Sequence, residues 1–203
     1  MTETEFDRWQ QRFAAPGYLF GTAPSAFLKA RAQLLRPGQS ALAVADGEGR
    51  NGVFLAEQGL DVLSLDFSPQ AQDKARDLAK QRGVSLRLEQ ADVLSWTWPA
   101  AAFDVVAAIF VQFATAEERP RFFGNIKKTL KPGGLLLMQG YRPKQLDYKT
   151  GGPSDVKRLY TRELLEEAFD DFSALDISEH DSVIQEGAGH AGISALIDLV
   201  GRK

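Results

Sequence analysis

The chain has 203 residues, of which 44% are hydrophobic and 25% are charged, and its formal net charge is −3. This length and composition predict a globular domain with a sizeable core. The net negative charge argues against a nucleic-acid-binding protein, whose affinity depends on phosphate contacts. The absence of cysteine excludes disulfides, thiolate metal sites and a cysteine nucleophile.

No apolar run reaches the roughly 18 residues that a membrane-spanning helix needs. The first 13 residues are polar and acidic and do not resemble a signal peptide. We therefore expect a cytoplasmic protein with no membrane partner.

The N-terminal part, residues 1–38, is predicted to be a helical extension. Residues 3–13 have the pattern of an amphipathic helix with aromatic side chains on one face, and a loop with proline and glycine follows. A second helix is predicted from Ser25 to Leu35, where Pro37 and Gly38 end it.

From residue 39 onward, predicted strands and helices alternate. The predicted strands are residues 41–45, 61–67, 85–90, 103–110 and 135–141, followed by two long strands within residues 171–203 that are joined at 186–192. The predicted helices are residues 50–59, a helix capped by Ser68 that ends near Gly83, a helix opened by the capping box Thr115–Glu118, and a helix that begins at Thr161.

This alternation predicts an α/β fold, with a parallel sheet covered by helices on both faces. The last two strands have no helix between them and must therefore be antiparallel. One domain spanning residues 1–203 is expected.

A glycine loop follows the first predicted strand. Gly47, Gly49 and Gly52 have the spacing of a dinucleotide-binding turn, and Asp66 ends the next strand 19 residues after Gly47. A carboxylate at that position is placed to accept hydrogen bonds from ribose hydroxyls. The pattern predicts an adenosine-containing ligand, and the alternative is a tight turn followed by an ordinary surface aspartate.

Two acidic residues in this loop bear on the class of ligand. Asp46 and Glu48 would repel a pyrophosphate at the helix N-terminus. S-adenosylmethionine (SAM) has no phosphate and carries a sulfonium, so an acidic loop suits it. Asp92, after the third strand, is placed to accept a hydrogen bond from an adenine amino group, with the Val93 backbone beside a ring nitrogen. The alternative for Asp92 is a loop or capping aspartate.

In this order and spacing, the chain resembles class I SAM-dependent methyltransferases. The stretch GEGRNGVFLAEQGLDV, residues 47–62, is similar to small bacterial members related to the tellurite-resistance methyltransferase, and the resemblance extends from Tyr18 to Gly192. It implies a three-layer α/β sandwich with a seven-stranded, mostly parallel sheet whose last strand is antiparallel. Residues 39–203 would form this Rossmann-like core, and residues 1–38 would be an extension or lid.

The resemblance also implies a set of cofactor contacts. These are Asp46, Gly47, Glu48, Gly49 and Asn51 in the first loop, Asp66 and Phe67 at the ribose and adenine, Ala91, Asp92 and Val93 at the adenine, and Ile109 and Phe110 beside the methionine part.

The N-terminal extension is expected to lie across this site. Trp9, Tyr18 and Phe20 would cover the cofactor, and Arg12 would meet its methionine carboxylate. The alternatives are plain packing of the aromatic side chains on the sheet and a solvated arginine.

The first loop departs from the family pattern, which is acidic-x-Gly-x-Gly-x-Gly. Here Ala43 stands at the acidic position and Ala45 at the first glycine. Our hypothesis is that Asp46 takes over part of the missing carboxylate's role near the cofactor's ammonium. Ala45 is predicted to have a negative φ, since alanine at positive φ is costly.

Methyl transfer from a sulfonium requires mainly alignment of donor and acceptor and exclusion of water. A base is needed only where the acceptor must lose a proton. His190 is the best candidate base, with Tyr141 or Glu186 as its partner, and the alternative is a turn histidine bonded to backbone. Gln112, Tyr148 and Glu186 are predicted on the substrate side, and no metal site is predicted.

We therefore expect a methyltransferase that moves a methyl group from SAM to a small-molecule acceptor by in-line displacement, with S-adenosylhomocysteine as product. An NAD(P)-dependent oxidoreductase follows from the literal glycine spacing. A non-catalytic SAM-binding protein follows from the degenerate loop. The expected partners are a small-molecule acceptor and no nucleic acid, in a monomer or homodimer.

Overall fold

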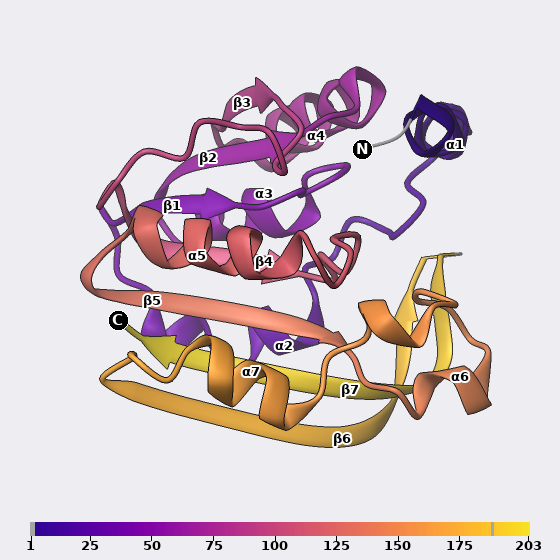
Figure 1. Ribbon diagram of the computed structural model, residues 1–203. Coiled ribbons are helices and arrows are strands. Elements are labelled where there is room, and N and C mark those ends of the chain that lie inside the picture. Colours follow the sequence, from indigo (N-terminus) through magenta and orange to yellow (C-terminus); the bar gives the residue numbers. More distant parts are fainter. Residues whose placement is uncertain (1–2, 188) are drawn as a thin grey trace. The chain divides into compact units, whose positions relative to one another are not determined.

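The computed structural model describes residues 3–187 and 189–203. The chain divides into two compact units, one made of the residues up to Thr97 with Glu186–Gly189, the other of Trp98–Gln185 with His190–Lys203. The seven strands follow the order β3-β2-β1-β4-β5-β7-β6 (Figure 1). This confirms the predicted class, a seven-stranded and mostly parallel sheet flanked by helices, while the single-domain organisation stays a prediction.

The elements have the following bounds. The strands are β1 (Ser40–Ala43), β2 (Asp61–Asp66), β3 (Arg87–Gln90), β4 (Phe103–Ile109), β5 (Leu130–Tyr141), β6 (Ala174–Glu186) and β7 (His190–Arg202). The helices are α1 (Glu3–Ala14), α2 (Ala26–Lys29), α3 (Arg50–Glu57), α4 (Pro69–Arg82), α5 (Arg119–Thr129), α6 (Gln145–Tyr148) and α7 (Arg162–Ala168), with 3-10 turns η1 (Ala32–Leu34) and η2 (Val156–Arg158).

In the first unit, β1, β2 and β3 are parallel, so their carboxyl ends lie at one edge. Helices α3 and α4 pack against each other and against these strands. The predicted start of α4 is confirmed, because the Ser68 hydroxyl accepts a hydrogen bond from the Ala71 N–H at 3.1 Å and Pro69 follows it. The helix ends at Gly83, whose φ of 70° is the left-handed conformation of a helix C-terminus.

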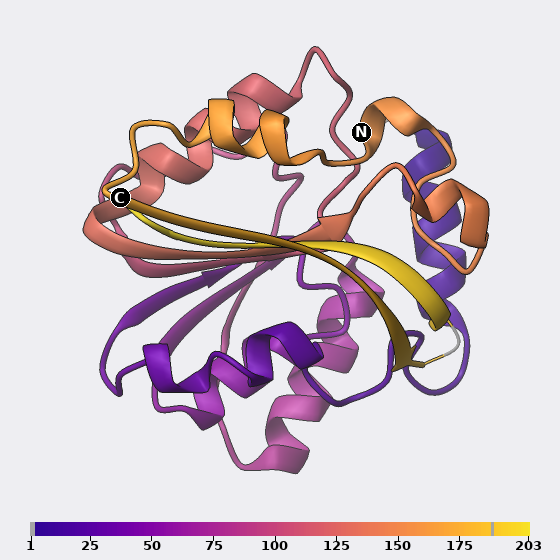
Figure 2. The same ribbon diagram turned by 90° about the horizontal axis from the view of Figure 1, so that it is seen from below.

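In the second unit, β4 and β5 are parallel, whereas β7 runs antiparallel to β5. The predicted antiparallel ending is therefore confirmed. Helices α5 and α7 lie on the same side of these strands (Figure 2). Between them, Phe123 contacts Tyr160 and Phe169 with ring centroids 5.6 and 5.2 Å apart, which forms an aromatic core for this unit.

The predicted helix from Ser25 to Leu35 is wrong in its length. Ser25 caps α2 as expected, accepting from the Leu28 N–H at 3.1 Å. Arg31 then leaves the helical conformation, with φ −113° and ψ 15°, and only the short turn η1 follows. The capping box before α5 is confirmed, because Thr115 and Glu118 exchange hydrogen bonds of 2.9 and 3.3 Å.

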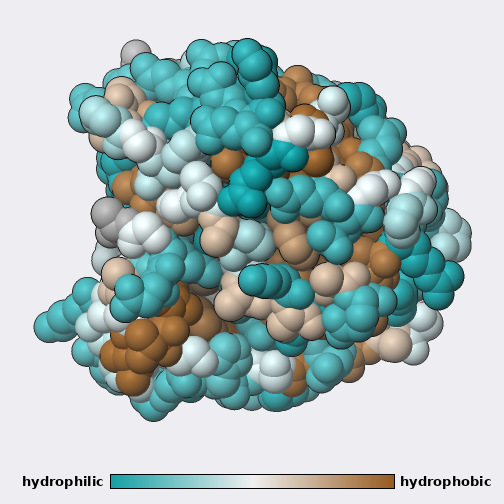
Figure 3. Space-filling view, turned by 180° about the vertical axis from the view of Figure 1, so that it is seen from behind, coloured by the Kyte–Doolittle hydropathy of each residue, from teal (hydrophilic) through white to brown (hydrophobic). Residues whose placement is uncertain are grey.

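Exposed large hydrophobic side chains are few among the described residues. They are Val156, Val183 and Ile193, the last two in β6 and β7. Figure 3 shows hydrophobic side chains gathered at the lower left of one face, within a surface that is otherwise mixed. Within the described residues, no helix combines the length and hydropathy that crossing a membrane requires.

Candidate cofactor and acceptor sites

The loop after β1 turns through left-handed conformations. Ala45 has a φ of 47°, Gly47 of 58° and Gly49 of 86°. The prediction of a negative φ at Ala45 is wrong. The turn requires a left-handed residue at this position whichever side chain occupies it, and the fold overrides the preference of alanine at a cost of about 1–2 kcal/mol.

Ala45→Gly should therefore raise the free energy of unfolding by about 1 kcal/mol, because the relieved strain exceeds the entropy that glycine loses on folding. Urea unfolding monitored by circular dichroism measures this change. Ala56→Gly, a control within the regular helix α3, should destabilise the protein instead. A loss of stability in both variants would mean that Ala45 is not strained.

The Asp46 carboxylate lies beneath the loop at the N-terminus of α3. It accepts hydrogen bonds from the Gly52 N–H and from the Ser64 hydroxyl, each at 3.0 Å. A Cβ on Gly52 would collide with this carboxylate, which explains the third glycine of the motif. Burial raises the pKa of Asp46 to about 7, although its hydrogen bonds act in the opposite direction. The Gly52 N–H, one of the backbone donors at the start of α3, is therefore already bonded to the chain's own carboxylate.

Asp66 joins the loops that follow β1 and β2. Its buried carboxylate accepts from the Gly47 N–H at 2.8 Å and from the Ser68 N–H at 2.9 Å. Burial raises the pKa of Asp66 to about 6. Because each carboxylate oxygen accepts more than one hydrogen bond, Asp66 keeps capacity for ribose hydroxyls. Its neighbour Phe67 packs on Phe6 of α1, with ring centroids 5.6 Å apart.

The segment after β3 lies against the end of β2. The Ala91 N–H donates to the Asp66 carbonyl at 3.0 Å, and the Val93 side chain is buried. The Asp92 carboxylate accepts from the Leu94 N–H at 3.0 Å, which is a loop-capping contact. The structure thus brings the three predicted cofactor loops to one edge of β1, β2 and β3.

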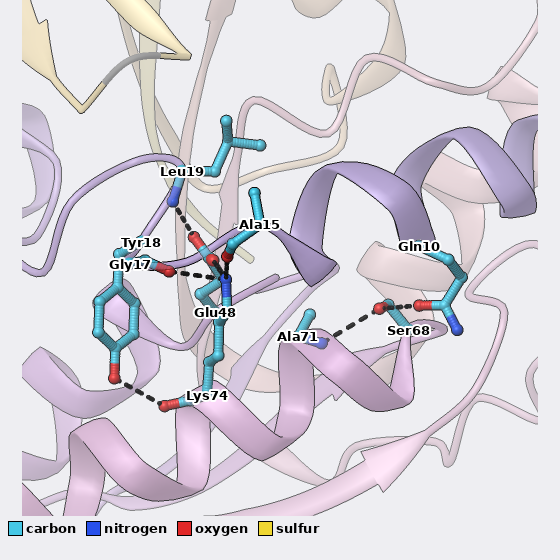
Figure 4. A network of polar contacts seen from close by, with 9 residues as sticks. All are labelled: Gln10, Ala15, Gly17, Tyr18, Leu19, Glu48, Ser68, Ala71 and Lys74. Atoms are coloured by element: carbon cyan, nitrogen blue, oxygen red, sulfur yellow. Dashed lines mark hydrogen bonds and ion pairs between the residues drawn. The ribbon is translucent and has the colours of Figure 1, made fainter.

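Glu48 does not stand free in the loop (Figure 4). Its carboxylate accepts from the Leu19 N–H at 2.7 Å and pairs with the Lys74 ammonium at 2.8 Å. The negative charge of Glu48 is therefore balanced inside the protein. The role of Lys74 is not predictable from the sequence, since no local pattern links it to a residue 26 positions earlier.

Two other predicted contacts have packing roles. The Asn51 side-chain oxygen accepts from the Ser25 N–H at 3.0 Å and ties the extension to α3. A Cβ on Gly49 would lie 2.5 Å from the Cβ of Ala75 in α4. Gly49 is therefore needed for the close approach of α4.

The N-terminal extension contacts the glycine loop. Phe13 is buried, and its ring lies 3.4 Å from the Cβ position of Gly47. The Arg12 guanidinium lies 4.4 Å from the ring centre of Trp9 and 5.8 Å from that of Phe20, and burial lowers the pKa of Arg12. The predicted contact of Arg12 with a cofactor carboxylate stays a prediction, and the observed partners are aromatic rings.

Tyr18, the other predicted cofactor residue of the extension, lies against α4. Its hydroxyl donates to the Lys74 carbonyl at 3.2 Å. Burial raises the pKa of Tyr18, so the hydroxyl stays protonated near neutral pH.

Glu186 belongs to the first unit and forms a buried ion pair with Arg50. The two side chains are 10% and 7% exposed, and their charged atoms are 2.7 Å apart. The Gly189 N–H donates to the Leu19 carbonyl at 3.0 Å. The turn between β6 and β7, whose residue 188 lies outside the described residues, is thus fastened to the extension and to α3. The predicted substrate-side role of Glu186 stays a prediction.

In the second unit, the structure brings the two predicted catalytic residues together. His190 contacts Phe110 and Tyr141, with ring centroids 4.6 and 5.7 Å apart. Phe110, directly after the buried Ile109, has a φ of 58°, which is a strained conformation for an aromatic residue. The contacts are between rings, and the catalytic role of His190 and Tyr141 stays a prediction.

Gln112 and Tyr148 are both bonded within the protein. Gln112 donates to the Tyr141 carbonyl at 2.8 Å and accepts from the Tyr141 N–H at 2.6 Å, so it clamps the end of β5. The Tyr148 hydroxyl donates to Asp181 at 2.8 Å and ties α6 to β6. In the part of the chain that the structure describes, no cluster of side chains has the composition of a metal site.

Comparison with known proteins adds the following findings. Residues 41–134 match the family profile of the methyltransferase domain. The chain is 33% identical over 104 residues to demethylmenaquinone methyltransferase of Thermus thermophilus, a match that covers 50% of this chain and 47% of that protein. The chain thus spans about half the length of this curated relative.

Two solved structures share the fold. One, reported for the conversion of a disulfide bond into a thioacetal group during echinomycin biosynthesis, has a TM-score of 0.75 at 20% identity and covers 100% of this chain and 90% of that chain. The other, a SAM-dependent methyltransferase from Methanosarcina mazei, has a TM-score of 0.64 at 16% identity and covers 84% of this chain and 95% of that chain.

Proposed function

We propose that this chain, whose residues 41–134 match the profile of the methyltransferase-domain family, transfers a methyl group from SAM to a small-molecule acceptor and releases S-adenosylhomocysteine. The family match and the shared fold agree with the resemblance to class I SAM-dependent methyltransferases, which is confirmed. The closer resemblance to the tellurite-resistance branch stays a prediction.

The position of Asp46 is the observation that favours SAM over a dinucleotide as the cofactor. Its buried carboxylate fills the N-terminus of α3, where it accepts from the Gly52 N–H. A pyrophosphate brought to that helix end would meet this carboxylate, so an NAD(P)-dependent oxidoreductase does not fit the loop. An adenosine without phosphate would need only ribose and adenine contacts, which we assign to Asp66, Phe67 and Asp92. The residues present therefore fit SAM.

When bound, SAM would supply an electrophilic methyl group on its sulfonium, which would pass in line to a nucleophilic atom of the acceptor as its bond to sulfur breaks, with the neutral thioether S-adenosylhomocysteine as leaving group. The chain's own residues would bind the cofactor and orient it. Asp66 would accept from the ribose hydroxyls, the Ala91–Val93 segment would meet the adenine, and α1 would exclude water from the glycine loop. His190 would take up a proton only where the acceptor carries one.

The proposal of a small-molecule acceptor rests on two supports. The relative from Thermus thermophilus is named for methylation of demethylmenaquinone, which is a small molecule. The net charge of −3 does not favour a nucleic acid as acceptor.

Asp66→Asn should weaken SAM binding about 10- to 100-fold, because a carboxylate hydrogen bond to a ribose hydroxyl contributes about 1.5–3 kcal/mol. Isothermal titration calorimetry at pH 8, above the pKa of about 6, measures the change with Asp66 ionised. Asp61→Asn makes the same chemical change at the opposite end of β2 and should leave the affinity unaltered. Equal affinities of the two variants for SAM would show that Asp66 does not contact the cofactor. SAM binding without turnover on a broad acceptor panel would favour the binding-only protein.

A further inference from the structure

We propose that Glu48 and Lys74 are positioning residues whose ion pair fastens the N-terminal segment Ala15–Leu19, and with it α1, over the glycine loop. In this role the pair sets the rates at which the cofactor enters and leaves. The inference rests on the proposed function, because it takes the glycine loop to be the place where SAM binds.

The Lys74 ammonium is held by three acceptors (Figure 4). It donates to the Ala15 carbonyl at 2.8 Å, the Gly17 carbonyl at 2.6 Å and the Glu48 carboxylate at 2.8 Å. An ammonium has three N–H donors, so these contacts use all of them. One side chain of α4 therefore binds the extension at two backbone positions and the glycine loop at a third point.

Glu48 is the second residue of the ion pair that fastens the N-terminal segment. Its side chain is 2% exposed, and its second oxygen accepts from the Leu19 N–H at 2.7 Å. Because Glu48 lies between Gly47 and Gly49, the contact connects the extension directly to the loop backbone. Removal of Lys74 would leave this carboxylate buried without its cation, which is a strongly unfavourable state.

The fastened segment carries α1 onto the loops that are proposed to hold the cofactor. The Phe13 ring lies against Gly47, and Phe6 packs on Phe67. Gln10 bonds to the Ser68 hydroxyl at the start of α4. A cofactor that approaches Gly47 and Phe67 would meet these α1 side chains first. Its entry would therefore require α1 to move away from the two loops.

The test compares Lys74→Met with Lys74→Arg, which keeps the charge, and with Lys80→Met, a matched change at an exposed position of α4. Hydrogen exchange of the ligand-free protein reports on residues 15–19. Stopped-flow mixing reports the association and dissociation rates of S-adenosylhomocysteine, and circular dichroism checks that each variant is folded.

We expect faster exchange at residues 15–19 in Lys74→Met, with both rates for S-adenosylhomocysteine raised about tenfold, which corresponds to a barrier about 1.4 kcal/mol lower. Lys74→Arg should restore the wild-type behaviour, and Lys80→Met should not differ from it. If the pair had only a structural role, Lys74→Met would lower the stability of the protein and leave the two rates unchanged. That result would overturn the proposal. Unaltered exchange at residues 15–19 would overturn it as well. A wild-type protein that binds no S-adenosylhomocysteine would instead refute the proposed function, whatever the exchange shows.

Discussion

Replacing Asp46 with asparagine should reduce the loss of stability that the wild-type protein suffers as the pH rises from about 4 to about 7. Burial raises the pKa of Asp46 from 3.8 to about 7. A carboxyl whose pKa is raised in the folded state contributes stability that is fully present below the unfolded pKa and is lost as the pH rises through the folded pKa. The shift of about 3 units corresponds to about 4 kcal/mol.

Asparagine suits the site because its side-chain oxygen can accept from the Gly52 N–H while its amide faces the Ser64 hydroxyl. The measurement is urea unfolding of both proteins at several pH values from 4 to 8. The variant should gain stability relative to wild type as the pH rises. Asp73→Asn, at an exposed position of α4, should show no such trend. A difference from wild type that is the same at every pH would show that the Asp46 carboxylate titrates normally.

Glu186→Ala should destabilise the protein by about 3–5 kcal/mol. The substitution leaves the Arg50 guanidinium buried without its partner, and an uncompensated buried charge is costly. The same change releases the turn between β6 and β7 from the first turn of α3. Equilibrium unfolding in guanidinium chloride measures the loss.

The double variant Arg50→Met with Glu186→Leu is the informative control, since it removes both charges. It should regain most of the stability, because replacement of a buried pair by apolar side chains is often close to neutral. Asp73→Ala, which breaks the exposed pair with Arg76, should have little effect. If the double variant were as unstable as Glu186→Ala, packing of the turn would account for the loss rather than the unpaired charge.

The parts of the fold that local signals encode could be predicted from the sequence. Ser68 and Thr161 cap their helices as expected, because a cap depends on residues three positions apart. The alternation of strands and helices predicts the parallel sheet, and the missing helix before β7 predicts its antiparallel direction. The left-handed Ala45 could not be predicted from residue preference, since the turn of the whole loop sets its φ.

The candidate site could be predicted only in outline. The ends of β1, β2 and β3 meet as expected, and Asp66 lies at that edge. The partners of the loop's charged residues were not predictable. Arg50 and Glu186 are 136 positions apart, and no periodic pattern relates them. Glu48 already has a cation in Lys74, and the Asp46 carboxylate is bonded to the Gly52 N–H at the start of α3.

The most direct test of the central claim is calorimetric titration of the wild-type protein at pH 8 with S-adenosylhomocysteine and, in parallel, with NADH. We predict binding of one S-adenosylhomocysteine per chain and no heat of binding with NADH. Binding of NADH without binding of S-adenosylhomocysteine would contradict the account.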